Sequence, residues 1–184
     1  MKQHIIPALR LTVACIILFI GLYPLLIFAI AQAAPAKGQG ETVTVDGKTV
    51  GYQLEGQKFT ADYYFWSRPS AAGYNAAGSA GSNKGPSNPS YLAEVQDRID
   101  TFLVHNPGIT KAQIPSDMIT ASGSGLDPDI SLQGAAIQAA RIAHVRNLSK
   151  EKILSLINKY TEKSINGIEK INVLKINIAL DNLK

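Results

Sequence analysis

Residues 11–31 read LTVACIILFIGLYPLLIFAIA and contain no charged side chain. Folded as an α-helix at 1.5 Å per residue, they would extend about 31 Å, which matches the hydrocarbon core of a bilayer. No apolar run of similar length follows in the sequence. The sequence therefore predicts one transmembrane helix, followed by a single domain on one side of the membrane.

A cleaved secretory signal is the alternative interpretation of this segment. Lys2 and Arg10 give it a basic start, and Ala31-Gln32-Ala33 before Ala34 resembles a cleavage site. The apolar core of a signal peptide is typically about 7–15 residues long, and this run is longer. We therefore expect a retained anchor, whereas cleavage would give a soluble periplasmic binding protein that begins at Ala34.

The orientation of the span follows from its flanks. Lys2 and Arg10 precede it and Lys37 and Lys48 follow it, so the difference in basic residues is small. A long C-terminal domain is translocated largely regardless of its charge. We expect a cytoplasmic N-terminus at residues 1–10, a span at 11–31, a linker at 32–40 and an extracytoplasmic domain at 41–184.

The composition of the chain excludes several classes of function. The formal net charge is only +4, and no dense run of Lys or Arg and no nucleic-acid-reading motif is present, so binding to nucleic acid is not expected. The only cysteine, Cys15, lies in the apolar run, which leaves no disulfide framework. The three histidines, His4, His105 and His144, are scattered and predict no metal site.

Strands are predicted near both ends of the domain. Residues 43–50 alternate apolar and polar side chains around Asp46-Gly47, the pair that favours a two-residue hairpin turn. Residues 174–181 alternate Leu, Ile, Ile and Leu with Lys, Asn, Ala and Asp, which is typical of a half-buried strand.

Helices are predicted between these strands. Residues 91–105 place their apolar side chains on one helical face, and residues 131–146 carry closely spaced alanines. A third helix is expected from Ser149, a good N-cap with Glu151 in the first turn. The domain is therefore expected to be α+β, with helices on one face of a small antiparallel sheet.

The long stretch 67–90 fits neither a helix nor a strand. More than half of it is Gly, Pro or Ser, and it directly follows the aromatic run Tyr63-Tyr64-Phe65-Trp66. A loop of this length in a compact domain is usually functional or disordered. Two interpretations of the aromatic residues stay open: they are core residues that fix the loop, or they are anchors of a protein interface.

The glycine-rich segments contain residues for two kinds of chemical site. Ser122 or Ser124 could act as a nucleophile with His105 or His144 as base and Asp127 as orienting acid, but the surrounding sequence does not match a nucleophile elbow. A tight turn with Asp127 capping a helix is the favoured interpretation. Residues 78–85 carry the glycines and the lysine of a phosphate cradle without its spacing, and an anion-binding nest of backbone amides is the alternative interpretation of this loop.

Three separated segments together resemble one known family. These are residues 64–71 (YFWSRPSA), residues 81–89 (GSNKGPSNP) and residues 120–128 (TASGSGLDP), and Gln138, Arg141 and residues 171–181 follow the same pattern. In this order they are similar to the KdpC family, the small single-span subunit of the bacterial potassium-transporting Kdp P-type ATPase. The resemblance covers nearly the whole chain.

The resemblance implies a non-catalytic accessory subunit in the bacterial inner membrane. Its implied partners are a channel-like subunit that binds potassium, a P-type ATPase subunit that hydrolyses ATP, and the lipid bilayer. The family is also described as a catalytic chaperone that raises the affinity of the ATPase subunit for ATP. ATP and potassium are therefore expected at the level of the complex, with no cofactor bound by this chain and no catalytic residue in it.

The resemblance and the composition together give two sets of candidate site residues. The first is a candidate partner interface with shape and backbone polarity but little titratable chemistry: Tyr64, Phe65, Trp66, Arg68, Pro69, Ser70, Asn83, Gly85, Pro86, Ser87, Asn88 and Pro89. The second is a family motif with a structural or nucleotide-related role: Ser122, Gly123, Ser124, Gly125, Leu126, Asp127, Pro128, Gln138 and Arg141.

Overall fold

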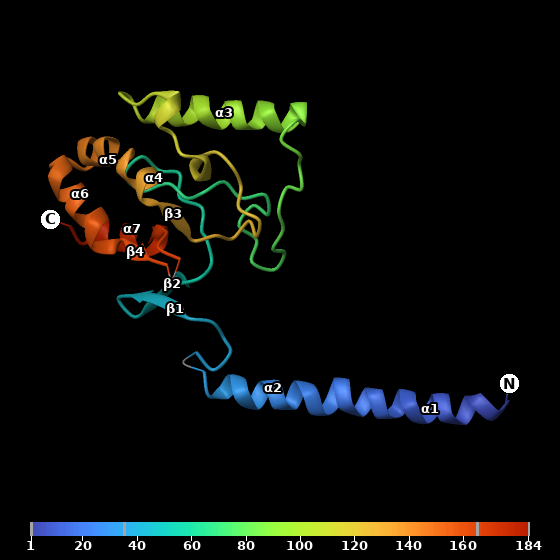
Figure 1. Cartoon of the computed structure of the whole chain (residues 1–184). Coiled ribbons are helices and arrows are strands. Elements are labelled where there is room, and N and C mark those ends of the chain that lie inside the picture. Colours follow the sequence, from blue (N-terminus) through green and yellow to red (C-terminus); the bar gives the residue numbers. More distant parts are fainter. Residues whose placement is uncertain (1, 35, 165, 184) are drawn as a thin grey trace. The chain divides into compact units, whose positions relative to one another are not determined.

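The computed structural model describes residues 2–34, 36–164 and 166–183. The chain divides into two compact units, Met1–Glu41 and Thr42–Lys184 (Figure 1). Pro35, in the expected linker 32–40, and the terminal residues Met1 and Lys184 lie outside the described residues, as does Ile165. The domain bounds expected from the sequence stay a prediction.

The first unit is a run of three helical segments, α1 (Lys2–Ile16), the π-helical segment η1 (Ile17–Leu22) and α2 (Tyr23–Gln32). Its 30 residues Gln3–Gln32 form one helix that is long and apolar enough to cross a membrane. The π-helical segment contains Gly21 and ends two residues before Pro24, which has no N–H to donate to the preceding turn. At its C-terminal end the Tyr23 N–H donates to the carbonyl oxygen of Leu18.

The second unit begins with the predicted hairpin. Strands β1 (Thr42–Val45) and β2 (Lys48–Tyr52) pair antiparallel, with a bulge between Val43 and Thr44. Asp46 and Gly47 both have positive φ angles, 49° and 75°, as a type I′ turn requires. The hairpin prediction is therefore confirmed.

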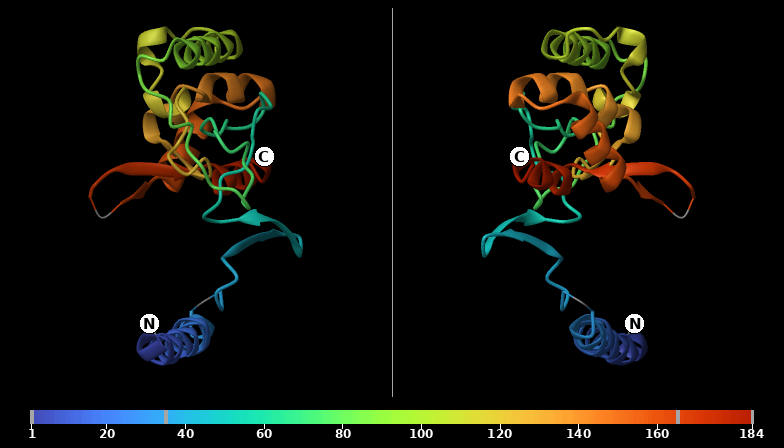
Figure 2. Two further views of the ribbon diagram at one scale, coloured as in Figure 1. Left: turned by 90° about the vertical axis from the view of Figure 1, so that its right-hand side faces the viewer. Right: turned by 90° about the vertical axis from the view of Figure 1, so that its left-hand side faces the viewer.

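A second antiparallel sheet has the strand order β3-β5-β4. Strands β4 and β5 can be followed side by side in orange-red in Figure 2. It consists of β3 (Asp129–Ser131), β5 (Glu169–Asn172) and β4 (Glu162–Lys163). In the register, Ile130 faces Ile171 across the β3–β5 pair. The α+β class is thus confirmed, with two small antiparallel sheets and helices around them.

The strand predicted at 174–181 is wrong, because these residues form helix α7 (Val173–Asp181). Asn172 caps this helix by accepting a hydrogen bond from the Lys175 N–H at 3.0 Å. Asn177, on the polar side of the expected alternation, is buried, whereas Ile178 is only half-buried. Helical spacing, and not alternation, therefore determines which side chains face the core.

The predicted helices are confirmed in two cases and divided in the third. Helix α3 (Pro89–His105) begins two residues early because Asn88 caps it, and α6 (Lys150–Tyr160) begins after the expected cap Ser149. The segment 131–146 instead forms α4 (Leu132–Ala136) and α5 (Ala139–Arg146). Ser131, and not Asp127, is the N-cap of α4, so the predicted capping role of Asp127 is wrong. Two short 3₁₀ turns, Lys111–Gln113 and Ser116–Met118, connect α3 to β3.

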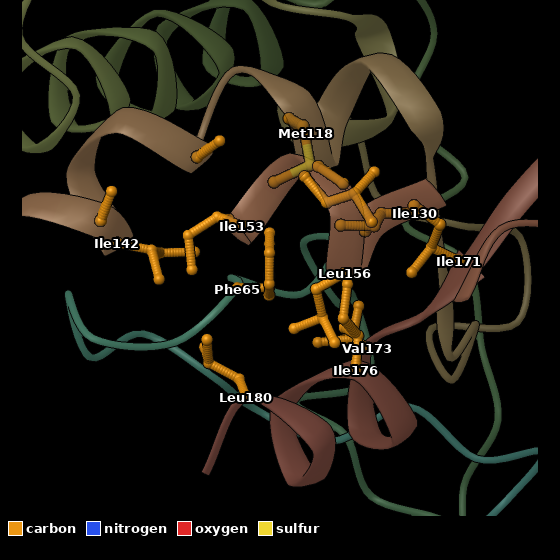
Figure 3. Packing of buried hydrophobic residues seen from close by; sticks show 14 of the residues in the cluster. Phe65, Met118, Ile130, Ile142, Ile153, Leu156, Ile171, Val173, Ile176 and Leu180 are labelled. Carbon is orange, nitrogen blue, oxygen red and sulfur yellow. The ribbon is translucent and has the colours of Figure 1, made fainter. Parts of the chain in front are cut away.

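The hydrophobic core lies where α4, α6 and α7 contact β5. Helix α6 directs its apolar face inward, and Phe65 enters the same cluster from the irregular segment that precedes the long loop (Figure 3). The members labelled in the figure are Phe65, Met118, Ile130, Ile142, Ile153, Leu156, Ile171, Val173, Ile176 and Leu180. The core therefore joins the C-terminal half of the chain to residues near position 65.

Two isoleucines of α7 test the helical assignment. Ile176 is fully buried and Ile178 is half-buried, although a strand would place both on one face. We expect Ile176→Ala to lower the free energy of unfolding by about 2–5 kcal/mol because it leaves a core cavity, and Ile178→Ala to lower it by less than half as much. Denaturant titration of the full chain in detergent, followed by the fluorescence of Trp66, the only tryptophan, measures both. Equal losses would contradict the helix.

Candidate functional site

The backbone of the aromatic segment is held by a side chain of α7. The Phe65 N–H donates to Asn177 Oδ1 at 2.8 Å, and Asn177 Nδ2 donates to the Phe65 carbonyl oxygen at 3.0 Å. Asn177 thus supplies the pair of hydrogen bonds that a neighbouring strand would supply. Phe65 has no exposed surface, so this member of the candidate interface is a core residue whose ring cannot touch a partner.

Gln138 holds the next residue in the segment. The Trp66 N–H donates to Gln138 Oε1 at 2.8 Å, and Gln138 Nε2 donates to the Gly134 carbonyl oxygen at 2.9 Å. Gln138 is fully buried at the N-cap position of α5. Its amide therefore satisfies polar groups of the core that would otherwise be costly to bury.

Arg141 of α5 is the charged centre of the same network. It donates to Asn106 Oδ1 at 2.9 Å, to Gln138 Oε1 at 2.7 Å, to the Tyr64 carbonyl oxygen at 3.1 Å and to the Asp62 carbonyl oxygen. Burial lowers the pKa of Arg141 to about 10, while the Asp62 carboxylate acts in the opposite direction. The guanidinium is therefore charged at neutral pH, and each of its three nitrogens donates at least one hydrogen bond in the interior.

Trp66 packs on the outer side of this network. Its ring contacts Phe102 edge to face at 5.9 Å between centroids, and the Arg141 guanidinium lies 4.9 Å from the ring centroid. His105 packs against the same ring and bonds Asp62 through Nδ1 at 2.8 Å. The aromatic run thus fixes the start of the long loop to α3 and α5.

The long loop is joined directly to residues 122–127. Arg68 Nη1 forms a 2.6 Å ion pair with Asp127 Oδ2, and Ser70 Oγ donates to the Gly125 carbonyl oxygen at 2.5 Å. Further along, the Ala80 N–H donates to the Ser124 carbonyl oxygen at 3.0 Å. Two of the three motif segments therefore lie side by side, although Arg68 and Ser70 lie 59 and 55 positions from their partners in the sequence.

The contact between the long loop and residues 122–127 requires a glycine at position 125. Its φ angle is +67°, and a Cβ atom there would lie 2.7 Å from the Ala80 carbonyl oxygen. A side chain would therefore strain the backbone and push the two segments apart.

The side chains of Ser122 and Ser124 stabilise the turn that contains Gly125. Ser122 Oγ accepts from the Gly125 N–H at 3.0 Å, and Ser124 Oγ accepts from the Leu126 N–H at 3.1 Å. His105 is engaged with Asp62, and His144 is exposed on α5. The nucleophile–base pairing that a serine hydrolase requires is not formed by these residues. Asp127 accepts a hydrogen bond from the Asp129 N–H and forms an ion pair with Arg68. It therefore stabilises the turn and does not orient a histidine.

The third motif segment, 81–89, lies on the surface and leads into α3. Asn88 Oδ1 accepts from the Tyr91 N–H at 3.2 Å, and Pro89 occupies the first turn. Lys84 pairs with Glu94, and this hydrogen bond lowers the pKa of the Glu94 carboxyl. The adjacent pocket of about 420 Å³ is lined by Lys84, Arg98 and that carboxylate. The segment with the glycines and the lysine of a phosphate cradle therefore has its lysine engaged and a negative charge beside it.

Several residues of the site were not found from the sequence. Asn177, Asn106 and Asp62 bind partners that lie far away along the chain. Arg146 is another, because it donates to the Tyr63 carbonyl oxygen and to Asp181 Oδ1, both at 2.7 Å. Only Asn177 could have been found from the sequence, because it is a polar residue within an otherwise largely apolar segment. Within the described residues, no cluster of three or more His, Cys, Asp or Glu side chains could hold a metal ion.

Removal of the Arg141 guanidinium tests the network. Arg141→Ala leaves buried acceptors on Asn106, Gln138 and Tyr64 without a donor, so we expect a loss of about 3–5 kcal/mol in the free energy of unfolding. Arg141→Lys keeps the charge but cannot reach all four acceptors, and it should recover less than half of that loss. Chemical denaturation is the measurement, with Lys159→Ala on the exposed face of α6 as the control. A change within about 0.5 kcal/mol in Arg141→Ala would contradict this role.

The comparisons with known proteins agree over nearly the whole chain. The model of the family described as KdpC, K⁺-transporting ATPase c chain, matches residues 5–182. The chain is 56% identical over 183 residues to the potassium-transporting ATPase KdpC subunit of Flavobacterium psychrophilum, with 99% of this chain and 100% of the relative covered. It is 57% identical over 182 residues to that of Flavobacterium johnsoniae, with the same coverage. The subunit of Methylococcus capsulatus is 43% identical over 191 residues and covered completely, as is this chain.

These matches extend across the membrane-spanning candidate, the aromatic segment and the glycine-rich junction. The identity with the two Flavobacterium relatives is far above the level at which family membership is in question. The chain belongs to the KdpC family, as a KdpC subunit of the K⁺-transporting ATPase.

Proposed function

We propose that this chain is a non-catalytic accessory subunit that helps to assemble and stabilise the potassium-binding and ATP-hydrolysing subunits of the complex. The proposal is supported by the observation that the polar motif residues form hydrogen bonds within the chain. Ser122, Ser124, Gln138 and Arg141 make internal hydrogen bonds that hold the chain in shape. Polar groups engaged in this way are not free to bind or activate a substrate.

The partner surface in this proposal consists of the outward-facing side of residues 68–70 together with residues 83 and 85–89. Arg68, Pro69 and Ser70 are half-buried, and residues 83, 85–89 are exposed. The ion pair to Asp127 and the Ser70 hydrogen bond fix its residues 68–70 before any partner arrives. A surface that is ordered in advance loses less conformational entropy on binding, which favours a stable interface.

The proposed topology places the second unit outside the cytoplasm, with residues 1–10 inside. A long C-terminal domain and a basic N-terminus favour this orientation. In this topology, an effect on the ATP affinity of the ATPase subunit would travel through contacts between subunits. The Glu94 carboxylate in the pocket beside residues 81–84 also disfavours a bound triphosphate there.

Arg68 tests the proposed partner surface. We expect Arg68→Ala to lower the recovery of the partner subunits and the potassium-stimulated ATPase activity of the complex, because a truncated hot-spot arginine typically costs about 2 kcal/mol, roughly a thirtyfold change in affinity. The fold should survive, because Arg68 is not part of the hydrophobic core and 21% of its side-chain surface is exposed. Affinity purification of the tagged chain in mild detergent measures the recovery.

Asp127→Asn is the matched variant, because it removes the charge that Arg68 pairs with and retains an oxygen for the Asp129 N–H. If Arg68 touches a partner, its removal weakens recovery more than Asp127→Asn does. Equal effects of the two single variants and of the double variant would mean that Arg68 acts only through the internal ion pair. Unchanged recovery with Arg68→Ala would also contradict the interface.

The topology has its own test. Lys159 is exposed on α6 and Cys15 is the only native cysteine, so Lys159→Cys in a Cys15→Ser background provides a single surface thiol. A membrane-impermeant maleimide should label it in cells with a permeable outer layer, because the domain lies outside the cytoplasm. Labelling only after lysis would reverse the orientation.

A further inference from the structure

Helix α3 lies at one edge of the second unit, and the views in Figure 1 and Figure 2 agree on this position. Its two buried side chains, Ile99 and Phe102, both belong to its C-terminal half. Val95 is only half-buried at the margin of the core, and the other side chains that precede Ile99 in the helix are exposed or half-buried. The burial of α3 therefore decreases along its axis toward the N-terminal end.

The C-terminal end of α3 is fixed through Asn106 to the body of the domain, meaning the part built on α4–α7. Asn106 is 2% exposed, its Nδ2 donates to the Phe102 carbonyl oxygen at 2.9 Å, and its Oδ1 accepts from Arg141 Nε at 2.9 Å. The edge-to-face contact between Phe102 and Trp66 adds to this attachment. One buried side chain therefore bonds the last turn of α3 and joins it to the network around α5.

The N-terminal half of α3 borders the pocket of about 420 Å³ described above. Tyr91, Glu94 and Arg98 line this pocket from the helix, and Ser70 and Ala121 line it from the body of the domain. Open space therefore lies where the C-terminal half of the helix has packed side chains. Movement of the N-terminal half toward or away from the body would change the pocket without breaking the core.

Few hydrogen bonds hold the N-terminal half of α3 in place. Among the described residues, two join the stretch 82–98 to other parts of the chain: Arg98 Nη1 donates to the Ile119 carbonyl oxygen at 3.0 Å, and Lys111 Nζ donates to Gln96 Oε1 at 2.9 Å. The second joins exposed side chains, for which water competes, so it contributes little. The bond from Arg98 is therefore the main polar restraint on this half.

The segment that leads into α3 is attached to the helix itself. Lys84 pairs with Glu94 of α3, and residues 82–88 are exposed. In the part of the chain that the structure describes, the last backbone hydrogen bond from this loop to the body runs from the Ala80 N–H to the Ser124 carbonyl oxygen. Residues 82–88 can therefore follow a movement of the helix while the chain before them stays in place.

We propose that α3 is a lever that pivots at Asn106 and opens and closes the pocket beside its N-terminal half, while the core stays folded. Residues 82–88 move with the lever, and the hydrogen bond of Arg98 limits its swing. Residues 68–70 stay with the body, because they are bonded to residues 122–127. The two parts of the proposed partner surface therefore change their relative position when the lever moves.

Distances between pairs of spin labels measure the lever. Ala93 and Val104 are both exposed on nearly the same face of α3, since they are separated by about three turns. Along the helix axis Ala93 lies about 20 Å from Asn106 and Val104 about 3 Å, so one rotation displaces Ala93 roughly six times as far. Each is replaced by cysteine and paired with Lys159→Cys on the exposed face of α6, in a Cys15→Ser background.

Double electron–electron resonance on the full chain in detergent gives the two distance distributions. We expect the distribution between Ala93→Cys and Lys159→Cys to be about twice as wide as that between Val104→Cys and Lys159→Cys, because only the first label lies far from the pivot. Two equally narrow distributions would overturn the lever. Two equally wide distributions would also overturn it, since α3 would then detach without a pivot.

Arg98→Ala tests the restraint on the swing. We expect it to widen the Ala93→Cys distribution further and to leave the Val104→Cys distribution unchanged, because the lost hydrogen bond joins the mobile half of α3 to the body. Lys163→Ala is the matched control, since it removes another paired cation that is 72% exposed on β4. An Ala93→Cys distribution that responds equally to both substitutions, or to neither, would contradict the proposal.

Two checks keep these outcomes interpretable. Trp66 fluorescence and the narrow Val104→Cys distribution confirm that each variant is folded before the widths are compared. The chain is measured without its partners, so failure of the lever would leave the accessory function standing, whereas failure of the wild-type chain to recover the other subunits would overturn that function alone.

Discussion

The buried guanidinium of Arg141 is the interaction on which the rest of the domain depends. A charge in the interior is tolerated only when its hydrogen bonds are satisfied, and here the acceptors come from Asn106, Gln138 and the backbone of residues 62 and 64. Residues 53–88 contain no helix or strand in the structure. Backbone groups of residues 62–66 therefore find partners among side chains, and Arg141, Gln138 and Asn177 provide them.

The same constraint determines where the surface residues lie. Asn177 and Gln138 fix Phe65 and Trp66 by their backbone atoms, so the position of the chain two residues later is also limited. Arg68 then reaches Asp127, and Ser70 reaches Gly125. A buried network thus determines the shape of a surface that has almost no regular secondary structure.

The elements that local sequence determines could be predicted. The Asp46-Gly47 turn, the Ser149 cap and the apolar face of α3 each depend on residues within a few positions of one another. The end of the chain could not be predicted in this way, because the alternation at 174–181 fits a strand and the cap at Asn172 is a signal for α7 that the alternation obscures. The network was also out of reach, since Asn177 lies 112 residues from Phe65 and Gln138 lies 72 residues from Trp66. No local pattern links such pairs.

The glycine- and serine-rich composition of the motif segments is therefore explained by their packing against one another. This packing leaves few polar groups free for a chemical role. The glycines and serines at 122–125 form a turn that packs against Ala80. The groups that can contact a partner are therefore those on the outer surface. A domain on a tether of about ten residues is confined near its complex at a high effective concentration. Under that condition, modest contacts at the proposed partner surface around Arg68 are strengthened by the tether. A small subunit can then stabilise a large assembly without any single strong site.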